Sequence, residues 1–231
     1  EMLGVKVPAS GAGWSWALAA GATAQALGLG PGSKAPDAND TVALAAQRLS
    51  EGFMWQRKSV EMLACTLISV NHAERGRTHE GVARCYAMLG FSLGVARMSG
   101  LGARYFERAR ATAREHGDDR SAVFIGYSHG VFQLGNGAWD VARASIDEAR
   151  RLAHEVHDLQ ELEVAETAAA NLEFFTGELR AAAQRFEGVH RSGRRRANLQ
   201  HEAWGLYGAA RSWIPLGEIT RARELVERAL T

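Results

Sequence analysis

The feature that most constrains this chain is a sequence pattern that returns every forty residues, five times, without an insertion. Each row of the pattern carries a small residue, a bulkier residue four positions on, and a small residue three positions beyond that. This spacing places the three residues on one face of an α-helix. The first column contains Met62, Gly102, Ala142, Ala182 and Ala222, and the second contains Thr66, Phe106, Ile146, Phe186 and Val226.

Another column of the pattern marks a break between the first and the second helix of each row. It contains Arg57, Arg97, Gly137, Gly177 and Gly217. Glycine at such a position predicts that a helix ends in a left-handed turn before the next helix begins. The expected helices before the break span 42–56, 82–96, 122–135, 162–176 and 202–215, and those after it span 59–75, 99–116, 139–156, 179–192 and 219–230. The expected breaks between rows lie at 75–78, 116–119, 157–158 and 192–194.

The repeating unit is therefore expected to be a helical hairpin, and the chain is expected to be all-α. A single hairpin cannot bury its apolar face alone, so neighbouring hairpins must stack to complete a core. A composition rich in alanine, with four prolines, favours helix throughout. We expect an N-terminal segment, 1–40, and five repeats in 41–231, divided as 41–80, 81–120, 121–160, 161–200 and 201–231.

The N-terminal segment has no charged residue between positions 7 and 33. Its few bulky aliphatic residues are too sparse for a membrane span, and a secretory signal peptide is the weaker alternative to a packed helix over 14–29. A Gly/Pro-rich linker is expected to follow that helix. The helix is also a candidate to occupy any groove that the repeats form.

Charge and cysteine content exclude several classes of function. The formal net charge is +1, whereas a dedicated nucleic-acid binder usually carries a clustered cationic excess. The two cysteines, Cys65 and Cys85, do not make a disulfide framework, and reduced, buried thiols in a cytoplasmic protein are the expectation.

The repeats resemble the tetratricopeptide repeat. Its signature of Leu-Gly in the first helix and Ala-x3-Phe-x2-Ala in the second is similar to Leu89-Gly90 followed by Gly102, Phe106 and Ala109. The period here is longer than the family's by about six residues, which lengthens the helices by roughly a turn and a half, and the signature's terminal proline is absent. The resemblance implies a right-handed solenoid whose first helices line the concave surface.

A second likeness comes from longer runs of sequence. Residues 71–75, 104–109, 113–118 and 134–139 look like the repeats of large bacterial signalling ATPases of the AAA/STAND type, which often also carry a cyclase, a kinase or a DNA-binding domain. That likeness implies a regulatory, cytoplasmic part of a larger protein with no catalytic residue of its own.

Transferring the solenoid orientation places one face of the first helices in a groove rich in aromatic residues and arginine, the types that dominate binding hot spots. We expect a partner protein or peptide to bind there. The alternative is that these aromatics pack against neighbouring repeats as core. The expected groove residues are Trp55, Arg84, Phe91, Phe124, Tyr127, Asn171, Phe174, Trp204, Tyr207 and Arg211.

Candidate chemistry in the chain is sparse, and no cofactor, metal, nucleic acid or membrane is expected as a partner. A small-molecule site or an enzyme that uses His129, Tyr127 or Glu173 as polar groups is the alternative function. His154 and His157 lie one turn apart, but a structural metal site normally needs four ligands. The arginine-rich run at 191–196 is expected to be a solvated loop between repeats. The last repeat ends without a polar capping helix, which leaves a face for self-association.

Overall fold

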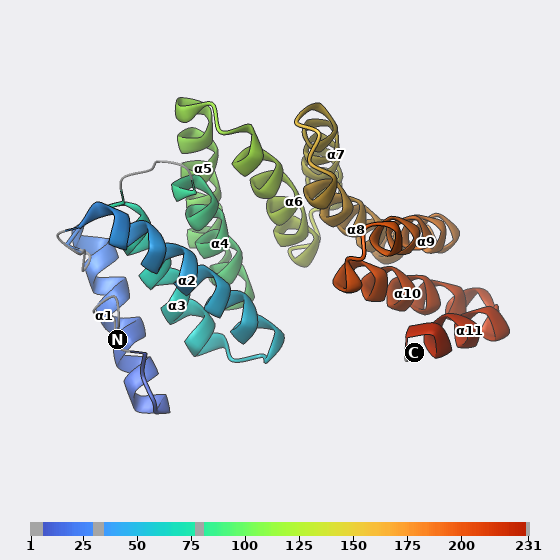
Figure 1. Ribbon diagram of the computed structural model, residues 1–231, viewed down its shortest axis with the longest axis horizontal. Helices are drawn as coiled ribbons and strands as arrows, with labels where there is room; N and C mark the ends of the chain where they lie inside the picture. Colours follow the sequence, from blue (N-terminus) through green and yellow to red (C-terminus); the bar gives the residue numbers. More distant parts are fainter. Residues whose placement is uncertain (1–6, 30–34, 77–80, 230–231) are drawn as a thin grey trace. The chain divides into compact units, whose positions relative to one another are not determined.

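The computed structural model describes residues 7–29, 35–76 and 81–229, which form eleven α-helices and one short 3-10 helix (Figure 1). The expectation of an all-α protein is confirmed for these residues. The helices are α1 (Gly11–Leu27), α2 (Pro36–Trp55), α3 (Ser59–Ala73), α4 (Val82–Val95), α5 (Ser99–His116), α6 (Asp119–Gly135), α7 (Trp139–Glu155), α8 (Leu159–Phe175), α9 (Leu179–Arg195), α10 (Leu199–Trp213), η1 (Ile214–Leu216) and α11 (Ile219–Ala229).

The chain divides into two compact units, Glu1–Ser121 and Ala122–Thr231. In the first unit α2 packs against α3, and α4 against α3 and α5. In the second, α9 packs between α8 and α10, and α8 and α10 also contact each other directly. Among the described helices, none combines the length and the hydropathy that crossing a membrane requires.

The left-handed turns follow the forty-residue period. Arg57 and Arg97 have φ angles of 57° and 64°, and the three glycines at Gly137, Gly177 and Gly217 have φ angles between 75° and 87°. The predicted left-handed break inside each row is thus confirmed, and in the first two rows arginine adopts it despite its Cβ. The helices that follow these turns, which we call the second helices of the rows, are α3, α5, α7, α9 and α11. All five begin at the predicted residue, two positions after the turn.

A second series of left-handed residues separates one hairpin from the next. Gly117, His157 and Ala197 have φ angles of 61°, 54° and 54°. Each is followed by a side chain that caps the next helix: the Oδ1 atoms of Asp118, Asp158 and Asn198 accept hydrogen bonds from backbone N–H groups two or three residues on, at 2.9 to 3.2 Å. These caps start α6, α8 and α10 three residues earlier than the apolar pattern predicts, because a cap is polar and leaves no mark on a hydrophobic period.

The expected break at 192–194 is wrong, because α9 continues to Arg195 and the turn falls at Ala197. Gly193 lies buried inside the helix. A Cβ at this position would stand 2.6 Å from the backbone nitrogen of Glu202, so this glycine permits the close approach of α10 rather than a turn. The arginine-rich run is therefore largely helical rather than a loop.

The two helices of a hairpin meet where the first helix carries a very small residue. A Cβ on Gly130 would stand 2.4 Å from Cγ1 of Ile146, sixteen residues on, and one on Gly90 would stand 3.0 Å from the ring of Phe106. In the first row the same pair is Ser50 and Thr66, whose hydroxyls are hydrogen-bonded at 2.7 Å. The small residue sets the distance between the helices, and the bulky partner fills the space beside it.

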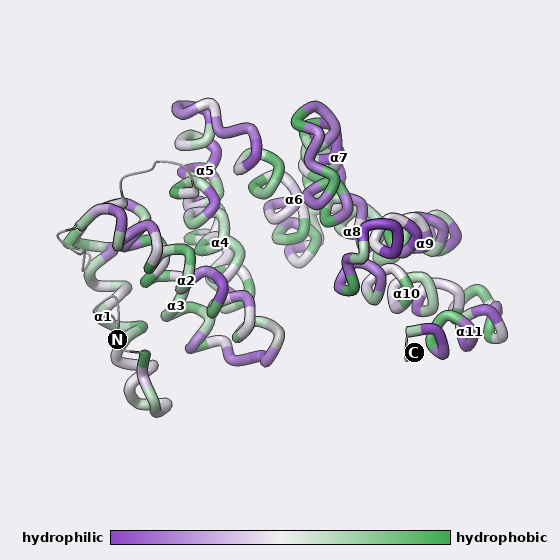
Figure 2. The backbone as a smooth tube through the Cα atoms, viewed as in Figure 1, coloured by the Kyte–Doolittle hydropathy of each residue, from purple (hydrophilic) through white to green (hydrophobic). Residues whose placement is uncertain are grey.

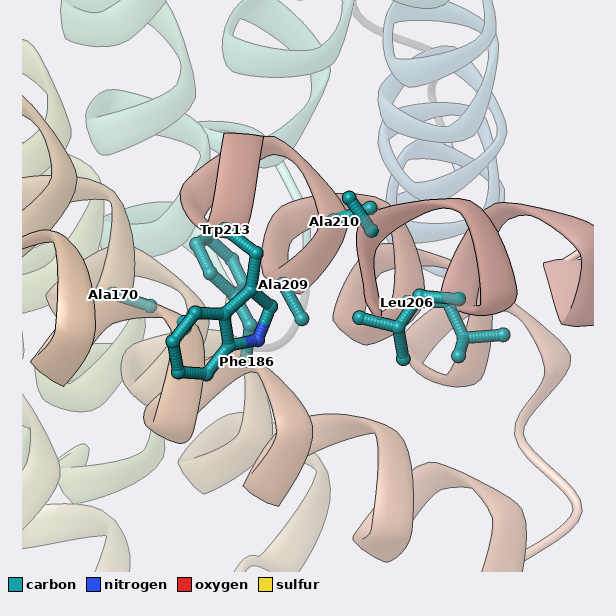
Figure 3. Packing of buried hydrophobic residues seen from close by; sticks show 9 residues of the cluster. Ala170, Phe186, Leu206, Ala209, Ala210 and Trp213 are labelled. Carbon is teal, nitrogen blue, oxygen red and sulfur yellow. The ribbon is translucent and has the colours of Figure 1, made fainter. Parts of the chain in front are cut away.

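The core of the second unit gathers around Trp213, which is 1% exposed at the end of α10 (Figure 3). Phe186 of α9 and Ala170 of α8 pack in the same cluster. The indole Nε1 of Trp213 donates a hydrogen bond of 2.9 Å to Glu187, so the polar edge of this buried ring has a partner.

Helix α1 explains why one second helix differs from the others. The helices α5, α7, α9 and α11 are hydrophilic, whereas α3 is apolar (Figure 2). Helix α1 packs on α3, where Trp14 meets Ala64 and Cys65, and the Trp14 and Phe53 rings lie 5.3 Å apart. Asn71 of α3 donates a hydrogen bond of 3.1 Å to the carbonyl of Gly21. The N-terminal helix therefore covers a second helix and does not lie along a surface of first helices.

Both cysteines are buried and unbridged. Burial, with a smaller contribution from Glu61, raises the pKa of Cys65 to about 11. Burial also raises the pKa of Cys85, whose sulfur lies 3.2 Å from the Ser69 hydroxyl. Both groups are therefore protonated thiols at neutral pH, which is an inert state of the side chain.

The left-handed conformation of Ala197 predicts that Ala197→Gly stabilises the protein. The alanine Cβ is strained at positive φ by roughly 1 to 2 kcal/mol. Glycine removes this strain but also increases the conformational entropy of the unfolded chain, which opposes folding, so the net gain in stability is about 0.5 to 1 kcal/mol. The matched control is Ala111→Gly in the middle of α5, where the same change lowers stability by about 0.5 to 1 kcal/mol. Urea unfolding of both variants measures the difference, and a lower unfolding midpoint for Ala197→Gly contradicts the expectation.

The close approach at Gly208 predicts that Gly208→Ala is costly. A Cβ there would stand 2.3 Å from the Phe186 ring, so the ring or α10 must shift, at a cost of about 1 to 3 kcal/mol. At Gly52, in α2, an added Cβ would meet no atom within 4 Å, and Gly52→Ala is expected to stabilise by up to about 1 kcal/mol. Thermal melts of the two variants should move in opposite directions; equal shifts would contradict this packing.

Candidate functional site

The expected groove residues of the first unit lie on α2 and α4. Trp55 is the last residue of α2, and its side chain lies outside the described residues. Arg84 and Phe91 of α4 are both half-buried.

Phe124 and Tyr127, expected in the groove, are instead packed inside the second unit. They are 5% and 8% exposed, and their rings meet edge to face with centroids 5.3 Å apart. The Tyr127 hydroxyl donates a hydrogen bond of 2.9 Å to Glu161 at the start of α8. For these two residues the structure fits the alternative, in which helix aromatics pack as core.

The other five expected residues lie on α8 and α10, two first helices that contact each other. Together with Phe175 they form what we name the α8–α10 aromatic surface, consisting of Asn171, Phe174, Phe175, Trp204, Tyr207 and Arg211. Tyr207 is 66% exposed and Phe175 is 54% exposed, so two large rings lie next to each other at the surface around Arg211. Asn171 and Arg211 hold the same position in two consecutive rows of the forty-residue repeat, so the repeat brings them side by side on neighbouring first helices.

Arg211 organises this surface. Its guanidinium carbon lies 4.1 Å above the Phe174 ring, 5.7 Å from Phe175 and 5.8 Å from Tyr207. Its Nη2 donates a hydrogen bond of 2.8 Å to Oδ1 of Asn171, forty residues earlier. The Asn171 amide is oriented by its own Nδ2, which donates to the Thr167 carbonyl at 2.9 Å. The arginine is thus held among aromatic faces by cation–π contacts.

The contacts of Arg211 are with an amide and with aromatic rings rather than with a carboxylate, and its buried Nε has no hydrogen-bond partner among the described residues. A buried N–H without a partner is costly, and so is a charge that is only partly compensated. Arg211 is therefore a cation of this surface that contacts one amide and several ring faces.

A buried carboxylate behind this surface was not found by sequence reasoning. Glu163 of α8 is 4% exposed and accepts a hydrogen bond of 2.5 Å from the Ser192 hydroxyl and a contact of 3.3 Å from Arg196. It is also hydrogen-bonded to Nδ1 of His201, whose ring stacks on Trp204 with centroids 5.2 Å apart. The cluster fixes the start of α10 and so the position of Trp204.

The forty-residue pattern of the sequence contains a sign of the Glu163 cluster. The residues equivalent to Glu163 in the other rows are Ala43, Ala83, Val123 and Ala203, all apolar. A single charged residue in an apolar column indicates a buried charge with dedicated partners, because an unpaired one would be strongly destabilising.

The polar residues of the alternative, enzymatic function have structural partners. Glu173 is bound by the guanidinium of Arg185 through contacts of 2.6 to 3.0 Å, and Arg185 also reaches Glu166 at 2.5 Å. His129 is 7% exposed, and its two ring nitrogens each lie 2.9 Å from a partner, Ser145 or Gln133. These arrangements link helices and leave neither group presented to a substrate.

The described part of the chain contains no candidate metal site of three or more ligands. No group of three or more His, Cys, Asp or Glu side chains among residues 7–29, 35–76 and 81–229 is placed to hold a metal ion. His154 and His157 are both exposed, at the end of α7 and in the turn after it.

Comparison with known proteins adds no family. No protein-family model matches the chain, and a search of curated proteins finds no relative.

The burial of these residues predicts which of them are core. Tyr207→Ala should change the free energy of unfolding by less than about 0.5 kcal/mol, because the ring is exposed. Phe124→Ala should cost about 3 to 5 kcal/mol, as expected for a buried aromatic. Chemical unfolding measures both, and a large loss for Tyr207→Ala would assign that ring to the core.

Proposed function

We propose that this chain is an interaction scaffold of the tetratricopeptide-repeat type, which binds a segment of a partner protein on the α8–α10 aromatic surface. The observation that carries the proposal is Arg211, held among exposed aromatic rings by Asn171 with its charge facing no carboxylate among the described contacts. Aromatic residues and arginine are enriched among binding hot spots. Aromatic rings bury a large area at a low cost in conformational entropy.

The repeat architecture supports the scaffold part of the proposal. Left-handed turns recur at forty-residue intervals, and in the hairpins α2–α3, α4–α5 and α6–α7 the two helices meet through a small residue and a bulkier one. Stacked hairpins of this kind form a right-handed solenoid in the tetratricopeptide family, with the first helices on the inner surface. The direct contact of α8 with α10 is compatible with that arrangement.

The chemistry of the surface defines the partner segment. Exposed rings at Phe175 and Tyr207 favour aliphatic or aromatic side chains, and Arg211 favours one carboxylate beside them. The expected partner is therefore a mainly apolar peptide that carries a single acidic group. On the sequence resemblance alone, we also propose that the scaffold is a regulatory, cytoplasmic part of a bacterial signalling ATPase.

The test is a selection of peptides from a random display library on the whole chain, followed by fluorescence anisotropy with the most enriched labelled peptide. Enriched sequences should combine apolar residues with one Asp or Glu. Tyr207→Ala and Arg211→Gln should each weaken binding by about tenfold or more, the loss typical of a hot-spot residue.

The matched control is Trp139→Ala, which removes an aromatic ring of 43% exposure at the start of α7, outside the α8–α10 aromatic surface. It should leave the affinity within about twofold of the unmodified chain. Enriched peptides that bind Tyr207→Ala as tightly as the unmodified chain would overturn the proposal, and so would a selection that enriches no peptide.

A further inference from the structure

A pocket between α9 and α11 gathers arginines that lie far apart in the sequence. It has a volume of about 620 Å³, and its walls include Arg191, Arg194 and Arg195 from α9 and Arg221 and Arg228 from α11. The first three form a local run in the sequence, but the two from α11 join them only through the packing of the last hairpin. This pocket lies on second helices, apart from the α8–α10 aromatic surface.

The pocket carries an excess of positive charge. Two carboxylates, Glu187 and Glu224, share its wall with the five arginines, so the difference is three positive charges. Glu187 is already engaged, because its Oε1 accepts hydrogen bonds from Trp213 at 2.9 Å and from Arg221 at 2.8 Å. An anion that enters the pocket therefore meets a wall whose arginines outnumber its carboxylates, and the net attraction favours binding.

The repeat supplies an internal comparison for these arginines. Forty residues earlier, on α7 and α9, the five positions are occupied by Arg151, His154, Glu155, Ala181 and Gly188. One arginine and one glutamate thus stand where the last pair of second helices carries five arginines. The arginine cluster is therefore not a feature of the forty-residue pattern itself.

One of the five arginines is oriented by a buried histidine. His190 is 6% exposed, and its Nε2 accepts a hydrogen bond of 2.7 Å from Nη2 of Arg228. A guanidinium only donates hydrogen bonds, so the ring must be neutral at this nitrogen. Burial, and then the charge of Arg228, lower the pKa of His190, which agrees with a neutral ring at pH 7. The contact holds Arg228 at the pocket wall.

We propose that this pocket binds a ligand that carries two or more adjacent phosphate groups. The planar fork of arginine fits phosphate oxygens in pairs, and several forks around one cavity suit a polyphosphate better than a single carboxylate. The volume lies in the range of small-molecule sites, about 300 to 1,000 Å³. An extended nucleic acid is a poorer fit, because it needs a cationic stripe and the chain has a net charge of only +1.

The test is isothermal titration of the whole chain with inorganic tripolyphosphate. Arg194→Gln and Arg228→Gln should each weaken binding by about tenfold or more, and binding should weaken as the NaCl concentration rises from about 50 to about 300 mM. The control is Arg223→Gln, which removes the same charge from α11. That side chain is 72% exposed, and its Nε lies 3.6 Å from Glu227. The control should bind within about twofold of the unmodified chain.

Two further arms identify the source of the phosphates. Tighter binding of a nucleoside triphosphate than of tripolyphosphate assigns the ligand to nucleotides. Capture by vesicles that contain phosphatidylinositol bisphosphate, reversed by tripolyphosphate, assigns it to a lipid headgroup. The proposal is overturned if tripolyphosphate does not bind at millimolar concentration, if Arg228→Gln binds it unchanged, or if single-stranded DNA binds while tripolyphosphate does not. Thermal melts of each variant establish that the comparison is made between folded proteins.

Discussion

The contact between a very small residue of a first helix and a bulky residue of the following helix is the constraint on which the hairpins depend. Gly130 against Ile146 and Gly90 against Phe106 leave no room for a further carbon atom. Such a contact fixes the distance between two helices, and the left-handed turn after each first helix fixes where the second one begins. Once both are set, the faces that remain at the surface are determined as well.

The second helices show the consequence of this arrangement. Where no further helix of the described residues covers their outer face, as on α7 and α9, that face carries charged residues. Where α1 covers it, on α3, the same face is apolar and bears Ala64 and the hydrogen-bonded Asn71. The sequence of α3 is therefore explained by its neighbour rather than by its place in the repeat. This is why a helix made almost wholly of small uncharged residues, α1, has a defined position.

The helical framework was more predictable than the candidate sites, because a repeat fixes only the columns that pack. The turns, the starts of all five second helices and the meeting of Asn171 with Arg211 follow from one forty-residue spacing. The starts of α6, α8 and α10 depend on polar caps, which the apolar pattern does not include. Gly193 resembles a turn glycine in the sequence, but in the structure it permits close packing of two helices. The residues of chemical interest are those that differ from the rest of their column, such as Glu163 in a column that is otherwise apolar. A departure becomes interpretable only through its partner, here Ser192, which three-dimensional packing supplies.

The second unit thus presents two surfaces of different chemistry that share one scaffold. The α8–α10 aromatic surface is mainly apolar with a single guanidinium, whereas the α9–α11 pocket is dominated by arginine. Trp213 belongs to neither set: its ring fills the core beneath α10, and its indole nitrogen and Arg221 both donate hydrogen bonds to Glu187 at the pocket wall. A ligand that draws Arg221 away from Glu187 would change the charge beside this buried ring. The core beneath α10 and the wall of the α9–α11 pocket therefore share one carboxylate, Glu187, which accepts hydrogen bonds from a group of each.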